Sequence, residues 1–214
     1  MTAGFQLDAL DLAALLCSRV CHDVINPVGA IVNGLEVLED EDDASMKAFA
    51  LDLIKKSSRT ASARLQFARI AFGAAGSAGA SIDLGDAENV ARGFIQDDKV
   101  TLSWSAPRVF MPKNKVKLLL NLLVIAGSTI PRGGSIDARV VGEAEKPTFE
   151  ILTQGSHARV PAGLVALLAG APENGPLDSH AIQPYYTGLI SRAAGMSVRV
   201  QAVEGGVRIS ALPA

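Results

Sequence analysis

Two long stretches of helical periodicity open the chain and constrain its fold more than any other feature. Apolar residues recur at helical spacing from about Asp8 to about Glu39, and again from about Ala44 to Phe72. The acidic run at 39–43 separates the two stretches and predicts a solvated turn. Two helices joined by so short a turn predict an antiparallel hairpin.

Such a hairpin cannot enclose both of its apolar stripes by itself. The second helix has its own apolar set, with basic residues on the opposite face: Phe49, Leu53, Ile54, Ala61, Leu65, Ala68 and Phe72. We therefore expect a homodimer in which two hairpins form a four-helix bundle. Packing of the hairpin against the rest of the chain is the alternative.

A histidine in the first helix lies on the side away from the apolar stripe. At about 100° per residue, one side of the helix gathers Leu16, Val20, Val24, Val28, Ile31, Leu35 and Leu38. His22 falls about 180° away, in a stripe with Ser18, Asn26, Gly29 and Asn33. An exposed histidine with Asp23 beside it is available for proton or phosphoryl chemistry. An ordinary surface histidine is the alternative interpretation.

Beyond the hairpin the pattern changes to alternating helices and strands. The glycine-, alanine- and serine-rich stretch 73–81 predicts a flexible connection. We place a helical domain at 1–74, a linker at 75–81 and an α/β domain at 82–214. The expected helices are 86–96, 112–127, 161–169 and 185–194, and the expected strands are 100–105, 135–141, 148–153, 197–203 and 207–212. The fold class is therefore a helical hairpin followed by an α/β layered domain.

Composition narrows the function. The chain has 214 residues, of which 49% are hydrophobic and 20% charged, so it can bury a sizeable core. A formal net charge of -2 and the lack of a basic, aromatic-interleaved stripe disfavour nucleic-acid binding.

The two cysteines and the apolar runs bear on location. Cys17 and Cys21 do not make a disulfide framework, which favours a reducing compartment. His22 lies about 140° from Cys17 around the helix, so we expect buried structural thiols and no metal site. The first residues do not resemble a signal peptide, and the run 118–126, interrupted by Asn121, is too short to span a bilayer. We expect a soluble, cytoplasmic protein without membrane insertion.

The segment His22-Asp23-Val24-Ile25-Asn26-Pro27 resembles the phosphoacceptor motif of sensor histidine kinases, which is His, Asp or Glu, two residues, Asn or Thr, and Pro. The order of hairpin, linker and α/β domain is also similar to that family. The resemblance implies a dimeric phosphotransfer hairpin followed by an ATP-binding-like α/β sandwich.

The nucleotide motifs of that family have decayed here. Asn121 matches one family asparagine, but Ile125 and Ser128 stand where a Mg²⁺-binding asparagine and a basic residue are expected. The adenine-binding box reads 153–157, with Thr153 in place of Asp, and the phosphate loop is reduced to 186–189. Isoleucine offers Mg²⁺ no oxygen, threonine weakens a charged contact, and tyrosine obstructs approach to phosphates. We therefore expect no ATP binding, and an atypical autophosphorylating kinase is an alternative.

A phosphoacceptor histidine without an ATP site resembles the ChpT-type histidine phosphotransferases of bacterial phosphorelays. This resemblance implies a homodimeric pseudo-kinase in two-component signalling. It implies that His22 accepts phosphate from the receiver-domain aspartate of a hybrid kinase and passes it to response-regulator receivers. It also implies that Mg²⁺ is held by the receiver partner and that the chain has no cofactor of its own. A non-catalytic dimeric adaptor for receiver domains is a further alternative.

We assign chemical roles within the motif. The ring nitrogen of His22 remote from the backbone is the expected nucleophile that becomes phosphohistidine. Asp23 is expected to orient the ring or accept a proton, although a merely solvated acid is the alternative. Asn26, one turn further on, can hydrogen-bond a phosphoryl group or a water, which leaves a phosphatase role open. Pro27 lacks an amide hydrogen, so the Asp23 carbonyl loses its helical donor and the helix can bend.

The surface around His22 is the expected docking site for receiver domains. On the first helix it consists of Ser18, Arg19, Gly29 and Asn33, and on the second of Lys55, Lys56 and Arg59. Small residues leave room for a partner and basic residues assist docking, although each could be a neutral surface position. We assign no role to His157 or His180, and expect Trp104 to be a core residue.

Overall fold

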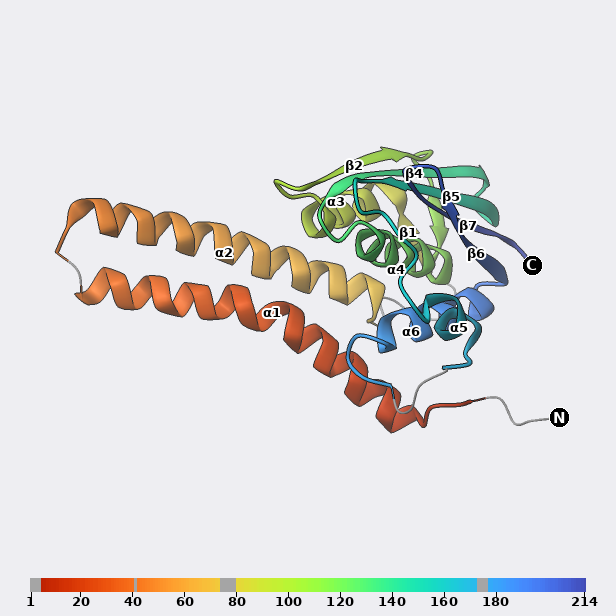
Figure 1. The fold of residues 1–214 in the computed structure, drawn as a ribbon, viewed down its shortest axis with the longest axis horizontal. Coiled ribbons are helices and arrows are strands. Elements are labelled where there is room, and N and C mark those ends of the chain that lie inside the picture. The colour runs from red at the N-terminus through yellow and green to blue at the C-terminus, as the bar shows by residue number, and fades with distance from the viewer. Residues whose placement is uncertain (1–4, 41, 74–79, 173–176) are drawn as a thin grey trace.

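The computed structural model describes residues 5–40, 42–73, 80–172 and 177–214. A long helical hairpin projects from an α/β domain, with the N-terminal part of the first helix running beside that domain (Figure 1). The predicted fold class is thereby confirmed. The predicted linker lies mostly outside the described residues, apart from Ala80 and Ser81.

The hairpin consists of α1 (Ala9–Asp40) and α2 (Ala44–Ala71), close to the predicted ranges. The Asp43 carboxylate caps α2 by accepting hydrogen bonds from the Ser45 and Met46 amides, which satisfies two otherwise orphan donors. The acidic turn thus also starts the second helix. On α1, the buried positions facing α2 are Pro27 and Gly34.

The α/β domain is built on a five-stranded sheet of order β2-β4-β5-β7-β6, in which β2 and β4 are parallel and the other pairs antiparallel. These strands are Val100–Ser105 (β2), Gly134–Glu143 (β4), Lys146–Gln154 (β5), Met196–Val203 (β6) and Gly206–Pro213 (β7). The helices are Leu84–Ile95 (α3), Lys113–Thr129 (α4), Leu164–Ala169 (α5) and Ile182–Ala193 (α6). Two short strands that the periodicity did not predict, Ser81–Asp83 (β1) and Phe110–Pro112 (β3), pair with each other.

The core lies between one face of the sheet and its helices. Burial alternates along β5, as expected for a sheet with one covered face. Helix α4 is buried along most of its length because the sheet covers one side and α2, α3 and α6 contact it too. Trp104 is partly buried against this core, as predicted.

The end of α2 belongs to the same core. Phe67, Ile70 and Ala71 are buried in it, and the Phe67 ring stacks on Phe94 of α3 with centroids 4.0 Å apart. The packing of the second domain therefore begins before residue 74, and α2 is fixed to the α/β domain at its base.

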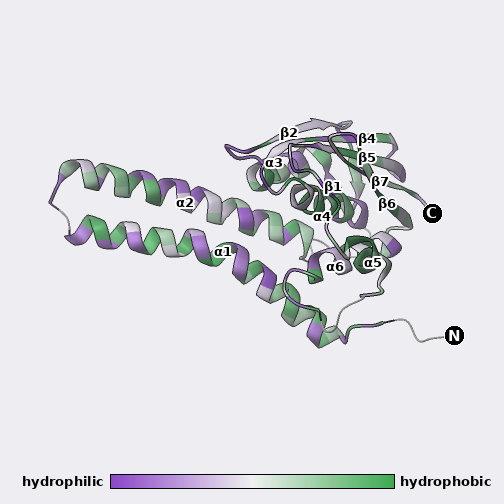
Figure 2. Ribbon diagram, viewed as in Figure 1, coloured by the Kyte–Doolittle hydropathy of each residue, from purple (hydrophilic) through white to green (hydrophobic). Residues whose placement is uncertain are grey.

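The outer hairpin is different, because much of its apolar surface is uncovered. Hydrophobic and hydrophilic segments alternate along both helices (Figure 2). Two members of the predicted α1 stripe, Val28 and Leu35, are exposed, as are Phe49 and Leu65 of α2. The single hairpin therefore leaves part of both stripes uncovered, as predicted, and the alternative, packing against the rest of the chain, does not bury these residues either.

Because α1 directs the face of Pro27 and Gly34 toward α2, both of its cysteines are exposed. Cys17 and Cys21 are free thiols on the outer side of the helix, so the prediction of buried thiols is wrong. Their proximity raises the pKa of the Cys21 thiol, since a Cys17 thiolate disfavours a second negative charge. Among the described residues, no cluster of three or more His, Cys, Asp or Glu side chains has the geometry to hold a metal.

Helix α1 also has the length and apolar composition of a membrane-spanning helix. The run 118–126, which is too short to span a bilayer, lies in the buried helix α4. A helix that keeps an apolar face for a partner helix has the same composition, so this feature is weak evidence for a membrane.

Candidate functional site

The segment His22–Pro27, which resembles a phosphoacceptor motif, lies midway along α1. The His22 side chain is 55% exposed, and its Nδ1 lies 3.6 Å from Asp23 Oδ1. The other carboxylate oxygen of Asp23 accepts a hydrogen bond from Arg19 Nε at 3.1 Å. Asp23 therefore lies between an arginine and the imidazole. With Nδ1 on the Asp23 side, Nε2 is the ring nitrogen left for an incoming group.

Pro27 frees a backbone carbonyl beside this site. Because proline has no amide hydrogen, the Asp23 carbonyl lacks its usual helical donor. Arg64 of α2 supplies the missing hydrogen bond through Nη1. Helix α1 changes direction near its middle (Figure 1), as expected for an internal proline. The sequence predicted the orphan carbonyl but not its partner.

The predicted docking residues fall into three groups. Ser18, Gly29 and Asn33 are exposed, as is Asn26, and a Cβ added at Gly29 would meet no atom within 4 Å. Arg19 is instead half-buried and engaged with Asp23.

The basic residues of α2, Lys55, Lys56 and Arg59, are exposed. They follow Ile54, which packs beside Gly34, and precede Arg64, which bonds to Asp23. They therefore lie between the levels of Gly34 and Asp23 on the hairpin. Lys56 Nζ lies 3.9 Å from Asp98 of the α/β domain.

His180, to which the sequence gave no role, contacts His22. Its ring lies edge to face with that of His22, with centroids 5.5 Å apart and planes at 75°. Asp178 shapes the loop that carries it, since its Oδ1 accepts hydrogen bonds from the His180 and Ala181 amides at 2.9 and 2.7 Å. These bonds lower the pKa of the Asp178 carboxyl. The Asp-x-His spacing could have predicted this turn, but nothing local predicts a contact with His22.

An apolar cluster holds this loop and α6 against the start of α1. Leu177, Ile182 and Tyr185 are buried there. Leu7, Leu12, Leu15 and Leu16 pack on them from the α1 side. The Tyr185 hydroxyl accepts a hydrogen bond from the Leu7 amide at 3.2 Å. The α/β domain is thereby anchored to the helix that carries His22.

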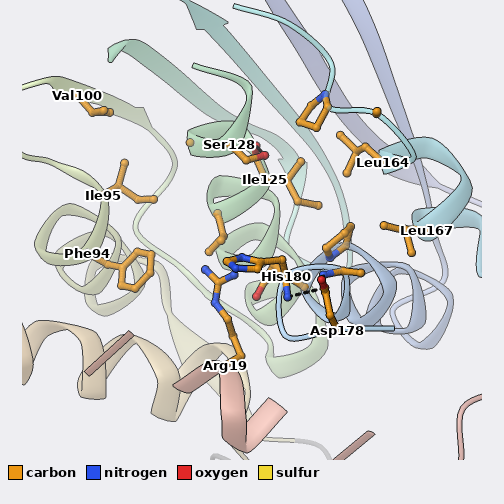
Figure 3. A pocket seen from close by; sticks show the side chains of 17 residues that line it. Arg19, Phe94, Ile95, Val100, Ile125, Ser128, Leu164, Leu167, Asp178 and His180 are labelled. Carbon is orange, nitrogen blue, oxygen red and sulfur yellow. Dashed lines mark hydrogen bonds between the residues drawn. The ribbon is translucent and has the colours of Figure 1, made fainter. Parts of the chain in front are cut away.

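A pocket of about 630 Å³ opens next to the His180 loop. Arg19, Asp178 and His180 lie together at one side of it, and Phe94, Ile125, Leu164 and Leu167 surround the remainder (Figure 3). Ile125 and Ser128, which stand where the resemblance to kinases implies a Mg²⁺-binding asparagine and a basic residue, both line it. Most of this lining is apolar.

The remaining polar residues of the kinase-like motifs are used for internal packing. Asn121 is buried; its Nδ2 donates to the Ala71 and Lys117 carbonyls, and its Oδ1 accepts from Gln183 Nε2. Thr153 is buried, with its hydroxyl 2.8 Å from that of Thr129. Both side chains hold elements of the domain together.

The segment 186–189 is not a phosphate loop. It forms the middle of α6, and the Tyr186 ring packs beside Phe72 with centroids 5.8 Å apart. A Cβ at Gly188 would lie 2.0 Å from the Leu168 carbonyl oxygen, so this glycine allows close approach of α5 and α6. The interpretation of these residues as a remnant phosphate loop is therefore replaced by a helix-packing role.

Comparisons with known proteins agree with this architecture. Residues 84–206 match the family described as the histidine phosphotransferase C-terminal domain. The protein phosphotransferase ChpT of Brucella abortus (strain 2308) is 52% identical over 215 residues, covering 99% of this chain and 100% of the relative. A solved structure of a bacterial phosphotransferase is 50% identical, with a TM-score of 0.89, covering 98% of this chain and 100% of that one.

The family match and the close relative identify an enzyme of the phosphotransferase class. The chain belongs to the histidine phosphotransferase family, as the resemblance to ChpT-type proteins predicted.

Proposed function

We propose that this phosphotransferase relays phosphoryl groups between receiver domains through His22 and does not use ATP. The observation that carries the proposal is the position of His22, with an exposed side chain and Nδ1 directed toward Asp23. Neutral imidazole is a nucleophile near pH 7, and an acid beside one nitrogen favours attack from the other.

The transfer has two balanced steps. The Nε2 lone pair of His22 attacks the phosphorus of an aspartyl phosphate on the donor receiver. The acyl phosphate P–O bond breaks and the donor carboxylate leaves, while the Nδ1 proton stays toward Asp23. A carboxylate oxygen of the acceptor receiver then attacks the same phosphorus, and the N–P bond breaks to restore neutral His22. Mg²⁺ belongs to the receiver in both steps.

The residues that line the pocket beside the His180 loop do not fit ATP. Ile125, Phe94 and Leu164 provide no oxygen for a Mg²⁺ ion and no positive charge for phosphates. Asn121 has its amide group committed to three internal hydrogen bonds. These observations favour relay of a partner's phosphate over autophosphorylation.

The proposal includes a homodimer. The exposed apolar side chains of α1, Ile25, Val28, Val32 and Leu35, recur about every turn along one outer face. Such a continuous apolar face favours an association interface. A second hairpin would cover it and complete a four-helix bundle, which also accounts for the composition of α1 in a cytoplasmic protein.

The docking surface for receivers completes the proposal. Ser18, Asn26, Gly29 and Asn33 share the exposed side of α1 with His22. Lys55, Lys56 and Arg59 of α2 are exposed and would offer positive charge to the acidic pocket of a receiver domain. Asn26, one turn after His22, can hydrogen-bond the transferred phosphoryl group.

One experiment separates the candidate functions. The protein is incubated either with labelled ATP alone or with a labelled, phosphorylated receiver domain from a hybrid kinase. We expect acid-labile label on the protein only with the receiver, and no label on the His22→Ala variant. Label from ATP alone would indicate a kinase, and absence of label in both reactions would indicate an adaptor.

The matched control is His157→Ala. His157 is a surface histidine of the α/β domain that bonds to Arg132 and Ser156. We expect this variant to be labelled like the wild type, because its bonds lie apart from the proposed site.

A further inference from the structure

The His22 imidazole is bordered by side chains from two different parts of the chain. Asp23, on its own helix, lies on the Nδ1 side at 3.6 Å. His180, from the loop before α6, packs edge to face against the ring with centroids 5.5 Å apart. An exposed histidine on an isolated helix would exchange between rotamers within nanoseconds. Here, two neighbours restrict that rotation.

The position of His180 is itself fixed from both sides. The Asp178 carboxylate accepts hydrogen bonds from the His180 and Ala181 amides, which sets the turn. Directly after it, Ile182 and Tyr185 are buried against Leu12, Leu15 and Leu16 of α1. The backbone at His180 is therefore anchored independently of the ring contact with His22.

Phosphoryl transfer depends on this kind of control. The attacking nitrogen must align with the P–O bond that breaks, and small misplacements of a reacting group lower the rate steeply. Asp23 alone fixes one edge of the imidazole but leaves the ring free to tilt. A second ring packed at 75° to it restrains the tilt.

We propose that His180 is a positioning residue for His22: its ring holds the phosphoacceptor imidazole with Nε2 directed outward. This inference rests on the proposed function of His22. It gives the α/β domain a task in phosphotransfer, because His180 reaches His22 only while that domain is docked on the start of α1.

The kinetic test compares two substitutions with a control. In His180→Ala, we expect kcat for transfer from a phosphorylated hybrid-kinase receiver domain to fall on the order of tenfold, with KM within about twofold of wild type. His180→Phe keeps a flat ring and should retain most of the rate, and His157→Ala should match wild type. A wild-type kcat in His180→Ala, a change confined to KM, or equal loss in both His180 variants would overturn the proposal.

A spectroscopic readout tests the contact without any receiver. The carbon-bound ring protons of His22 should show a ring-current shift by NMR that is lost in His180→Ala and largely kept in His180→Phe. His22 proton shifts identical in wild type and His180→Ala would contradict the ring contact.

The His22→Ala variant is assayed in parallel to separate two failures. Label on that variant indicates failure of the proposed function. A wild-type rate in His180→Ala, with no label on His22→Ala, indicates failure of the positioning role alone.

Discussion

The hairpin and the α/β domain use the same kinds of side chain in opposite ways. In the α/β domain, Asn121 and Thr153 are buried and bonded to neighbouring elements. In the hairpin, Asn26 and His22 are exposed on one face of α1. The difference indicates that buried polar groups hold the second domain together, while the first domain presents its polar groups at the surface.

The apolar residues differ in the same way. Phe149 and Ile151 are fully covered between the sheet and its helices. Val28 and Leu35 lie uncovered on α1. One region is covered within the single chain, and the other leaves apolar side chains that the proposed dimer would cover. Four predictions test this contrast, from the largest expected effect to the smallest.

Charges placed on the uncovered face should separate the dimer. In the double variant Val28→Glu and Leu35→Glu, we expect the dimer dissociation constant to rise at least a hundredfold, or about 3 kcal/mol, because two carboxylates would be desolvated in the bundle. Sedimentation equilibrium measures this. The control, Thr101→Glu with Ser103→Glu on the exposed face of β2, adds the same charge and should remain dimeric. If the dissociation constant were unchanged in both the variant and the control, the proposed four-helix bundle would be wrong.

The two asparagines should separate stability from activity. Asn121→Ala leaves the Ala71 carbonyl and the Gln183 amide without this partner, so the free energy of unfolding should fall by about 1–3 kcal/mol. Asn26→Ala should change it by less than about 0.5 kcal/mol while altering the transfer or dephosphorylation rate. Urea denaturation and a receiver-based assay give the two quantities. Equal stability losses would contradict the contrast.

Two glycines of α1 offer a sharper comparison within one helix. A Cβ at Gly34 would lie 2.7 Å from Ile54 Cγ1, so Gly34→Ala should destabilise the hairpin by about 1–3 kcal/mol. Gly29 has open space around it, and Gly29→Ala should stabilise the helix by up to about 1 kcal/mol. Thermal unfolding measures both. Slower transfer in the more stable Gly29→Ala variant would support a receiver contact at this residue. If both variants were destabilised, the open space around Gly29 would be contradicted.

The smallest effect concerns the loop before α6, which carries Asp178 and His180 and contacts α1. Hydrogen bonds lower the pKa of Asp178 in the folded protein, so its stabilising contribution is complete above the unfolded value of about 4 and is lost as the pH falls through the lower folded value. Asp178→Ala should cost up to about 1 kcal/mol at pH 7. The difference from wild type should shrink below about pH 4, as measured by urea denaturation across pH. A difference that grows in acid would reverse the assigned sign.

Periodicity predicted the features that depend on one element at a time. The hairpin, the five main strands and the exposure of His22 all follow from residues close together in sequence. The burial of Phe67 and Ala71 among residues of α3 and α4, and the contact of His180 with His22, depend on how distant elements dock. No local pattern carries that information.

The cysteines show a subtler failure. The apolar stripe of α1 extends over more of its circumference than one neighbouring helix can cover. Pro27 and Gly34 are the buried positions of α1. At Gly34 the lack of a side chain allows Ile54 of α2 to approach closely. Cys17 and Cys21 consequently lie outside the contact. Hydrophobicity alone predicts an apolar face, but not which part of it a neighbour occupies.

The hydrogen bond from Arg64 to the Asp23 carbonyl couples the axial position of α2 to the backbone of α1 beside His22. The backbone carbonyl of Asp23 accepts a hydrogen bond from α2, while the Asp23 carboxylate faces the His22 imidazole. An axial shift of α2 would move the Arg64 guanidinium, and with it a positive charge, away from that carbonyl. The surroundings of His22 are therefore connected to the register of the hairpin through a single backbone oxygen.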